Sequence, residues 1–306
     1  MTPWFYNIIY REIAFYYGHQ NISMHTRHLA STLAKFATLN FLCMTSFNIH
    51  AQSLEIEIGS FFSKTDTDIR VYDPFNGKEY DLNFESELNL PEDKNLAYLN
   101  LEYRFADRHQ VYLDWRRLHR QGVQESVSRP FQITLGGNTY HVGADAFLAT
   151  QLNLDLARFG YGYRFIKTEH LDVHFLTGFH ITRLGIGFEG DLELVIDNNR
   201  TEYGLHRNIF EQVTAPLPNV GFLVEHHISP KWLLKSHAHA FYLEFKDLKG
   251  WMYELEFAAK YSITEHFNFT ASFNYYELGV DYQTSITDLN VTYQFYGPMI
   301  KMAYKF

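Results

Sequence analysis

Apolar and polar residues alternate along most of the chain after residue 53, and this period of two predicts β-strands. In 251–261 the odd positions are aromatic or aliphatic, and the even positions are Met252, Glu254, Glu256, Ala258 and Lys260. The same alternation occurs in 95–105, 171–182 and 267–275. A strand has this pattern when one of its faces lies against an apolar environment and the other against a polar one.

Ten strands are predicted, at 54–72, 95–105, 110–128, 145–165, 171–190, 208–228, 232–245, 251–262, 267–278 and 287–306. Short turns at 106–109, 166–170, 229–231 and 263–266 alternate with longer polar stretches at 73–95, 129–144, 191–207, 246–250 and 279–286. This alternation is typical of an up-and-down antiparallel barrel, in which an even strand number brings both chain ends to one side. Eight or twelve strands remain open, because 78–90 also alternates and forms either a further strand or an external hairpin.

Two segments depart from the simple pattern. In 145–165 the apolar residues switch from even to odd positions. They are first Leu152, Leu154 and Leu156, and then Phe159, Tyr161, Tyr163 and Phe165. A β-bulge in this strand is the predicted explanation. Gly297-Pro298 weakens the ladder of the last strand, so we expect a bend or bulge there.

The last predicted strand ends in an aromatic residue. Its apolar positions alternate with Met299, Lys301, Ala303 and Lys305, and they are Ile300, Met302, Tyr304 and Phe306. This strand resembles the terminal strand of small outer-membrane β-barrel proteins of Gram-negative bacteria, whose last aromatic residue is read by the barrel-assembly machinery. The resemblance is to the class as a whole and covers 52–306.

The resemblance implies one transmembrane, antiparallel, up-and-down β-barrel of the all-β class, located in the bacterial outer membrane with both termini in the periplasm. It implies an assembly signal formed by Phe306, Tyr304, Met302 and Ile300. The implied partners are outer-membrane lipid and lipopolysaccharide, with periplasmic chaperones and the barrel-assembly machinery during biogenesis.

Composition agrees with a membrane barrel. Phe occurs 27 times and Tyr 22 times, and aromatic residues make up 17% of the chain. Membrane barrels use such residues in the girdles of the lipid-facing surface. The net charge of −9 argues against nucleic acid as a partner. Cys43 is the single cysteine, so the chain has no disulfide framework.

The amino-terminal region reads as an export signal. Residues 24–51 contain a basic start, an apolar stretch at 36–47 and a small residue, Ala51, at the expected cleavage site. Residues 1–23 precede a second methionine, Met24, and are interpreted as an upstream extension. Either Met1 or Met24 is the true start.

The polar faces of the predicted strands line the lumen. They carry Asn100, Glu102, Arg104, Asp114, Arg116, Asp155, Arg164, Asp172, His174, His180, Glu225, His227, Lys235, His237, His239, Glu254, Glu256, Lys260, Lys301 and Lys305. Unpaired charges away from water are costly, so opposite charges should pair across the lumen. Ten strands enclose little more space than side chains fill, which predicts a plugged or very narrow interior rather than a general diffusion porin.

The sequence signals for a metal site or a catalytic site are weaker than those for the barrel. His237-Ala-His239 could hold a metal with Glu225 or Glu256, and Asp66, Asp68 and Asp73 could meet Ca²⁺. Ser236-His237 and Ser229 near His227 are the nearest approaches to a nucleophile–base pair. None of these matches a complete motif, and no phosphate loop, zinc motif or nucleotide fingerprint occurs. We therefore expect no catalytic, metal or cofactor site.

These observations predict a non-enzymatic barrel with a structural or adhesive role, or a narrow, porin-like pore for small solutes. The alternative is an outer-membrane lipid-modifying or proteolytic enzyme. The external partner, the solute and the oligomeric state do not follow from the sequence.

Overall fold

The computed structural model describes residues 53–306, apart from 197–198, 202–205, 246–247 and 284–287. The predicted extension (1–23) and export signal (24–51), with Cys43, lie outside the described residues.

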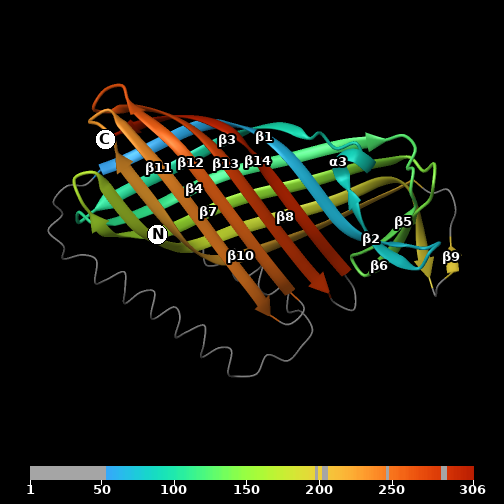
Figure 1. Ribbon diagram of the computed structural model, residues 1–306. Helices are drawn as coiled ribbons and strands as arrows, with labels where there is room; N and C mark the ends of the chain where they lie inside the picture. The colour runs from blue at the N-terminus through green and yellow to red at the C-terminus, as the bar shows by residue number, and fades with distance from the viewer. Residues whose placement is uncertain (1–52, 197–198, 202–205, 246–247, 284–287) are drawn as a thin grey trace, which may run out of the picture. The chain divides into compact units, whose positions relative to one another are not determined.

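Ten antiparallel strands form a closed barrel (Figure 1), which confirms the predicted fold and strand number. They are β1 (Ser53–Asp73), β3 (Asp93–Phe105), β4 (His109–Gln124), β7 (Leu148–Lys167), β8 (Leu171–Ile196), β10 (His206–His227), β11 (Trp232–Phe245), β12 (Leu248–Ser262), β13 (Phe267–Gln283) and β14 (Asp288–Lys305). Each strand pairs with the next in this order. The pairing of β14 with β1, from Lys305–Glu55 to Val291–Ile69, closes the barrel.

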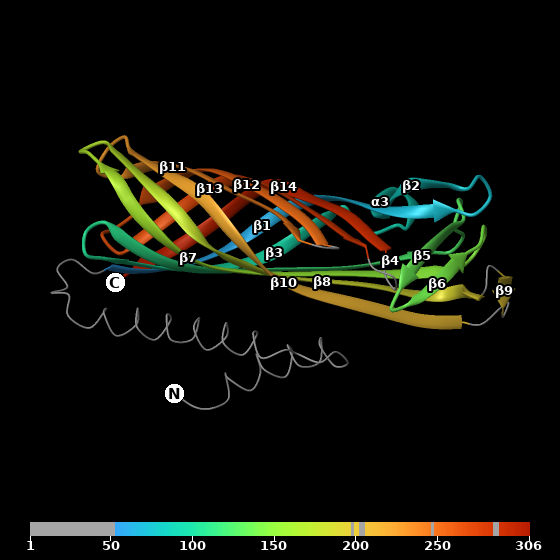
Figure 2. The same ribbon diagram turned by 90° about the horizontal axis from the view of Figure 1, so that it is seen from below.

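The two ends of the barrel differ. The short turns at 106–108, 168–170, 228–231 and 263–266 lie at one end, together with the start of β1 and the end of β14 (Figure 1). We call this the turn end and the opposite one the loop end. Figure 2 shows that the loop end continues into a long extension of the barrel wall.

Outward-facing side chains near the turn end form an apolar belt. Its most exposed members include Phe257 at 61%, Phe159 at 57% and Phe179 at 54%. The belt also contains Leu54, Ile58, Phe62, Leu99, Leu113, Trp115, Phe175, Ile181, Val220, Phe222, Leu234, Leu255, Phe269, Phe273, Ile300 and Met302. A surface this rich in exposed aromatic and aliphatic side chains is the lipid-facing surface of a membrane barrel.

The polarity of the wall inverts above the belt. On β7, Phe159 and Tyr161 face outward while Arg158 faces inward and is buried. Farther toward the loop end, Asn153 faces outward and Leu154 is fully buried inside. The side chains keep the same alternation, but the apolar ones now point to the interior, as in a water-soluble protein.

This inversion corrects the prediction for 145–165. The pairing of β7 with β8 keeps one register from Leu148–Gly190 to Arg164–His174, so no bulge causes the change of parity. The pairing shifts register only between Arg164 and Ile166, near the turn end. The change of parity instead reflects two surroundings, lipid and then water. Asp155, predicted in the lumen, is therefore on the outer surface, where it lies 3.6 Å from Arg117.

The other long strands invert in the same way. On β1, Leu54 and Ile58 face outward near the turn end, but Ile69 and Val71 are buried inside at the loop end. Strand β8 has 26 residues, although roughly 9–11 suffice to cross a bilayer. The extra length encloses one apolar core, which includes Phe61, Ile69, Leu118, Leu152, Leu154, Ile186, Phe188, Tyr276, Tyr293 and Phe295.

Additional elements cover the loop-end mouth (Figure 2). The segment 78–90 forms β2 (Lys78–Asn83), which pairs with β1 in an external hairpin, and then the one-turn helix α3 (Phe84–Glu87). Asn83 caps this helix by accepting a hydrogen bond from the Ser86 backbone N–H. No helix in the described part of the chain is long and apolar enough to cross a membrane.

A second hairpin, β5 (Phe131–Leu135) and β6 (Asn138–Val142), crosses the same mouth. Strand β6 pairs with β8, whereas β5 meets β1 and β14 at single rungs. Its turn is Gly136-Gly137, and both residues have positive φ angles, which favour glycine. The three-residue strand β9 (Asn199–Thr201) pairs with the end of β8.

The expected irregularity at Gly297-Pro298 is an interruption of the ladder. Pairing of β1 with β14 stops after Phe61–Met299 and resumes at Lys64–Tyr296 in the same register. Gly297 has φ +155, and a Cβ there would lie 2.1 Å from the Phe62 carbonyl oxygen. The ladder is thus broken without the extra residue that a bulge requires.

We predict that Phe257→Arg destabilises the barrel by about 2–4 kcal/mol if its side chain lies near mid-membrane. Gln121→Arg, on the outward face of β4 above the inversion, should be close to neutral because its side chain is exposed and polar. The free energy of unfolding in lipid vesicles measures both. Equal effects of the two changes would show that the belt does not mark the lipid-facing surface.

Candidate functional site in the barrel lumen

The lumen inside the belt is filled with charged side chains. The structure places every residue of the predicted charge network on the inward face, namely Glu102, Arg104, Asp114, Arg116, Arg164, Asp172, Glu225, Lys235, His237, His239, Glu254, Glu256, Lys260 and Lys301. Sequence reasoning missed Arg158 and Asn219, which also face inward and are buried. Arg158 was missed because the assumed bulge hid the true parity of β7.

The centre of the lumen is a buried ion-pair cluster of four side chains from three strands, β4, β7 and β12. Glu254 of β12 lies 2.5 Å from Arg116 and 2.8 Å from Arg158. Arg158 also contacts Asp114 at 2.5 Å. All four side chains are at most 6% exposed. Two guanidinium groups are thus balanced by two carboxylates, which offsets the cost of removing them from water.

Histidines lie beside this cluster. The Asn219 side-chain amide joins two of them, because its Nδ2 lies 2.9 Å from His180 Nδ1 and its Oδ1 lies 2.9 Å from His239 Nδ1. The rings of His237 and His239 are 4.3 Å apart. With the amide assigned this way, His239 donates to Asn219 and His180 accepts from it.

Two further layers lie toward the turn end. In one, Lys301 contacts Glu256 at 2.5 Å and Glu57 at 3.4 Å. In the other, Arg104 binds Glu102 and lies 2.8 Å from Glu225. The interior charges are therefore paired across the barrel rather than lined up along an open path.

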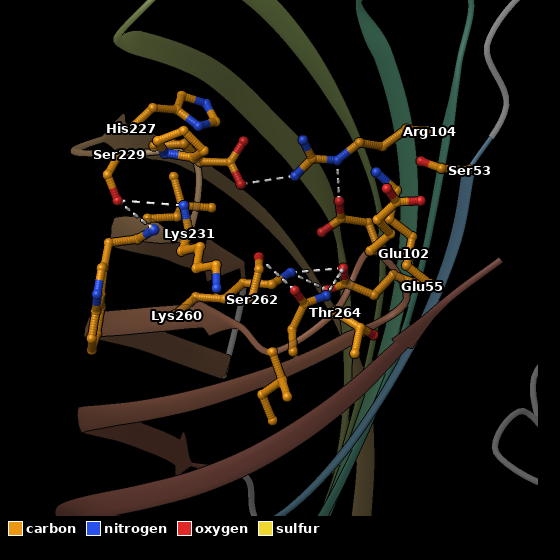
Figure 3. A pocket seen from close by; sticks show the side chains of 18 residues that line it. Ser53, Glu55, Glu102, Arg104, His227, Ser229, Lys231, Lys260, Ser262 and Thr264 are labelled. Carbon is orange, nitrogen blue, oxygen red and sulfur yellow. Dashed lines mark hydrogen bonds and ion pairs between the residues drawn. The ribbon is translucent and has the colours of Figure 1, made fainter.

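A cavity of about 630 Å³ opens at the turn end (Figure 3), and we call it the vestibule. Arg104, Lys260 and His227 line it, together with Glu55, which lies 2.7 Å from Lys260. Next to the central cluster, the cavity among Tyr98, Arg158 and His237 measures only about 60 Å³. The interior is thus hollow at the turn end and almost filled at the centre.

The weaker candidate sites are not assembled. Ser236 and His237 are adjacent on β11, so their side chains point to opposite faces. Ser229 caps its turn by accepting from the Trp232 N–H, and His227 lies 3.5 Å from Asp172.

The candidate Ca²⁺ ligands are also separated. Asp66 and Asp68 accept hydrogen bonds from the Asn83 side chain. Asp73 instead accepts from the Phe75 N–H, and this bond lowers the pKa of its carboxyl group.

The assembly residues predicted from the last strand lie on its outward face. Ile300, Met302 and Phe306 are 46%, 51% and 64% exposed. The Phe306 ring packs against Tyr304, with ring centroids 4.7 Å apart. Their role in assembly stays a prediction.

Comparisons with known proteins identify the fold. No known family description matches the chain, and no curated protein sequence matches it. The outer membrane protease OmpT from Escherichia coli has a similar structure, with a TM-score of 0.51 over 86% of this chain and 99% of that one, at 9% identity. This chain has the outer-membrane β-barrel fold.

Two other solved structures match less well. Ail of Yersinia pestis has a TM-score of 0.31 at 10% identity, covering 84% of this chain and 100% of that one. OprG from Pseudomonas aeruginosa has a TM-score of 0.31 at 13% identity, covering 82% and 95%.

Glu254→Gln should destabilise the barrel by about 3–5 kcal/mol, because it leaves two buried guanidinium groups with one carboxylate between them. The free energy of unfolding in vesicles measures the loss. Glu92→Gln is the matched control, since Glu92 pairs with Lys64 on the exposed surface and should change stability by about 0–1 kcal/mol. A neutral Glu254→Gln would contradict the ion-pair cluster.

Proposed function

We propose that this protein is a non-enzymatic, non-conducting barrel of the bacterial outer membrane whose loop-end extension acts as a surface recognition module. The observation that supports this proposal is the way the barrel interior is filled. Paired charges fill the lumen within the belt, and an apolar core fills it above. A path for ions would have to cross both.

The orientation of the barrel in the membrane is inferred from the lengths of the connections at its two ends. Outer-membrane barrels place short turns and both termini in the periplasm and longer connections outside. On this basis the vestibule faces the periplasm, and the extension with β2, α3, β5 and β6 faces the outside.

The extension supports a role in recognition or adhesion. It has its own packed core, so it presents a fixed surface rather than loose loops. Its tip carries Phe75, which is 73% exposed. Acidic side chains such as Asp66 and Asp81 lie on its outer face, where divalent cations can link them to lipopolysaccharide phosphates.

Planar-bilayer recording tests the closed lumen. The folded wild-type protein should give no steady unitary currents, because the central cavity is about a tenth of the vestibule's volume. A general porin reconstituted in the same bilayers provides the positive control. Steady currents from the folded wild type would refute the non-conducting barrel.

One observation favours the enzymatic alternative. On the outer surface just above the belt, His119 Nε2 lies 3.1 Å from Asp155 Oδ1, with both side chains about 30% exposed. An imidazole held by a carboxylate is the general-base half of a hydrolase site. Arg117 lies 3.6 Å from the same carboxylate oxygen, and none of the cavities described above includes this pair. We therefore interpret it as a surface ion pair.

Mass spectrometry of lipopolysaccharide and of an unstructured peptide, each incubated with the folded barrel, decides between the two readings. We expect no product. A product that disappears in His119→Ala and in Asp155→Asn, but persists in His206→Ala, would establish the enzyme. His206 is a fair control because it forms a similar exposed pair with Glu189, at 3.1 Å.

A further inference from the structure

Three buried side chains converge where the vestibule ends. Asp172 and His174 are two residues apart on the inward face of β8, and Glu225 pairs with Asp172 across the ladder to β10. One possible ligand atom from each lies within 4.8 Å of those of the other two. Each residue is at most 5% exposed. Among the described residues this is the one such group of histidine and carboxylate side chains.

Several buried polar atoms of these three side chains lack partners outside the group. Asp172 Oδ1 and His174 Nδ1 have no hydrogen-bond partner, and Glu225 Oε2 has only His174 Nε2, which lies 3.2 Å away. Buried polar atoms are normally satisfied, and leaving them unsatisfied is costly. Several such atoms in one place indicate a missing positively charged ligand.

The other oxygen of each carboxylate is already held. Asp172 Oδ2 is 2.9 Å from Arg164, and Glu225 Oε1 is 2.8 Å from Arg104. The two arginines therefore hold one oxygen of each carboxylate, and the other oxygen of Glu225 lies 3.2 Å from His174 Nε2. Outer groups orient the ligands of metal sites in the same way.

We propose that Asp172, His174 and Glu225 bind a divalent transition-metal ion, with Zn²⁺ as the representative. An imidazole with two carboxylates suits zinc, whereas Ca²⁺ and Mg²⁺ prefer oxygen ligands alone. Three protein ligands leave one position of a tetrahedral ion for water. This grouping differs from the His237–His239 pair considered from the sequence, because it joins neighbouring strands.

The ion can reach the site from the vestibule, and nearby positive charges limit its binding affinity. Glu225 lines the vestibule, and His174 lines an adjoining cavity of about 150 Å³. Arg104 and Arg164 lie close by, and Lys235 is 3.6 Å from Glu225. Their positive charge opposes a dication, so we expect micromolar rather than nanomolar binding.

Titration of the folded, full-length barrel with Zn²⁺ alone tests the site, by calorimetry and by the shift in unfolding temperature. The wild type should bind one ion and become more stable. Co²⁺ in its place should give the visible absorption of a tetrahedral site. His174→Gln should weaken binding at least about tenfold, because it removes the nitrogen ligand.

His237→Gln and His266→Gln serve as controls and should bind as the wild type does, since these residues lie outside the group. Glu225→Gln is a second test variant in case His174→Gln does not fold. The proposal fails if the folded wild type takes up no Zn²⁺ at millimolar concentration. It also fails if a folded His174→Gln or Glu225→Gln variant retains wild-type binding.

Discussion

The structure depends on one constraint, the strict alternation of side chains along strands that pass from lipid into water. A regular strand cannot turn its apolar residues around without a bulge, so the sequence itself must change parity where the surroundings change. On β7 this happens between Leu156 and Phe159, without a break in the pairing with β8. The position in the sequence where the apolar residues change parity therefore corresponds to the membrane boundary.

The inversion also determines how the interior is filled. Within the belt many inward positions carry charged side chains, although Tyr112, Leu176 and Leu223 also face inward and form a small apolar cluster. Because the ten-stranded lumen is narrow, these charges meet and pair, as Glu254 does with Arg116 and Arg158. Above the belt many inward side chains are apolar, and Phe188 packs against Phe84 of α3 and Phe131 of β5. The buried Arg120 in the same region pairs with Glu85 of α3. The charged lumen and the apolar core are thus enclosed by the same strands, paired in the same register.

Much of the barrel could be predicted from the sequence, because alternation and turn length are local signals. The ten strands and four short turns lie within a few residues of their predicted positions, apart from the loop-end extension of β8 and β13. The errors arise where one rule, that apolar means lipid-facing, was applied beyond the membrane. That rule placed Asp155 in the lumen and required a bulge between Leu156 and Phe159, where the pairing is regular; the register shift of β7 lies between Arg164 and Ile166.

Contacts between residues far apart in the chain could not be predicted from local sequence patterns. Nothing local in Gly136-Gly137 shows that their hairpin lies between β8 and β1 across the mouth. Likewise Asp172, His174 and Glu225 are adjacent only because β8 pairs with β10 in one particular register. A shift of that pairing by one residue would turn Glu225 away from the lumen.

The two ends of the barrel consequently present different surfaces. At the loop end a packed apolar core supports the outer surface. At the turn end a vestibule of about 630 Å³ opens, and the cavity beside the central cluster measures only about 60 Å³. Strand β10 shows the same division. It pairs with β11 only from Val220 to His227, and its loop-end half, with Pro216 and Pro218, pairs with β8 alone. The wall is thus paired on both sides of β10 from Val220 to the turn end, and β10 and β11 separate beyond Val220 toward the loop end.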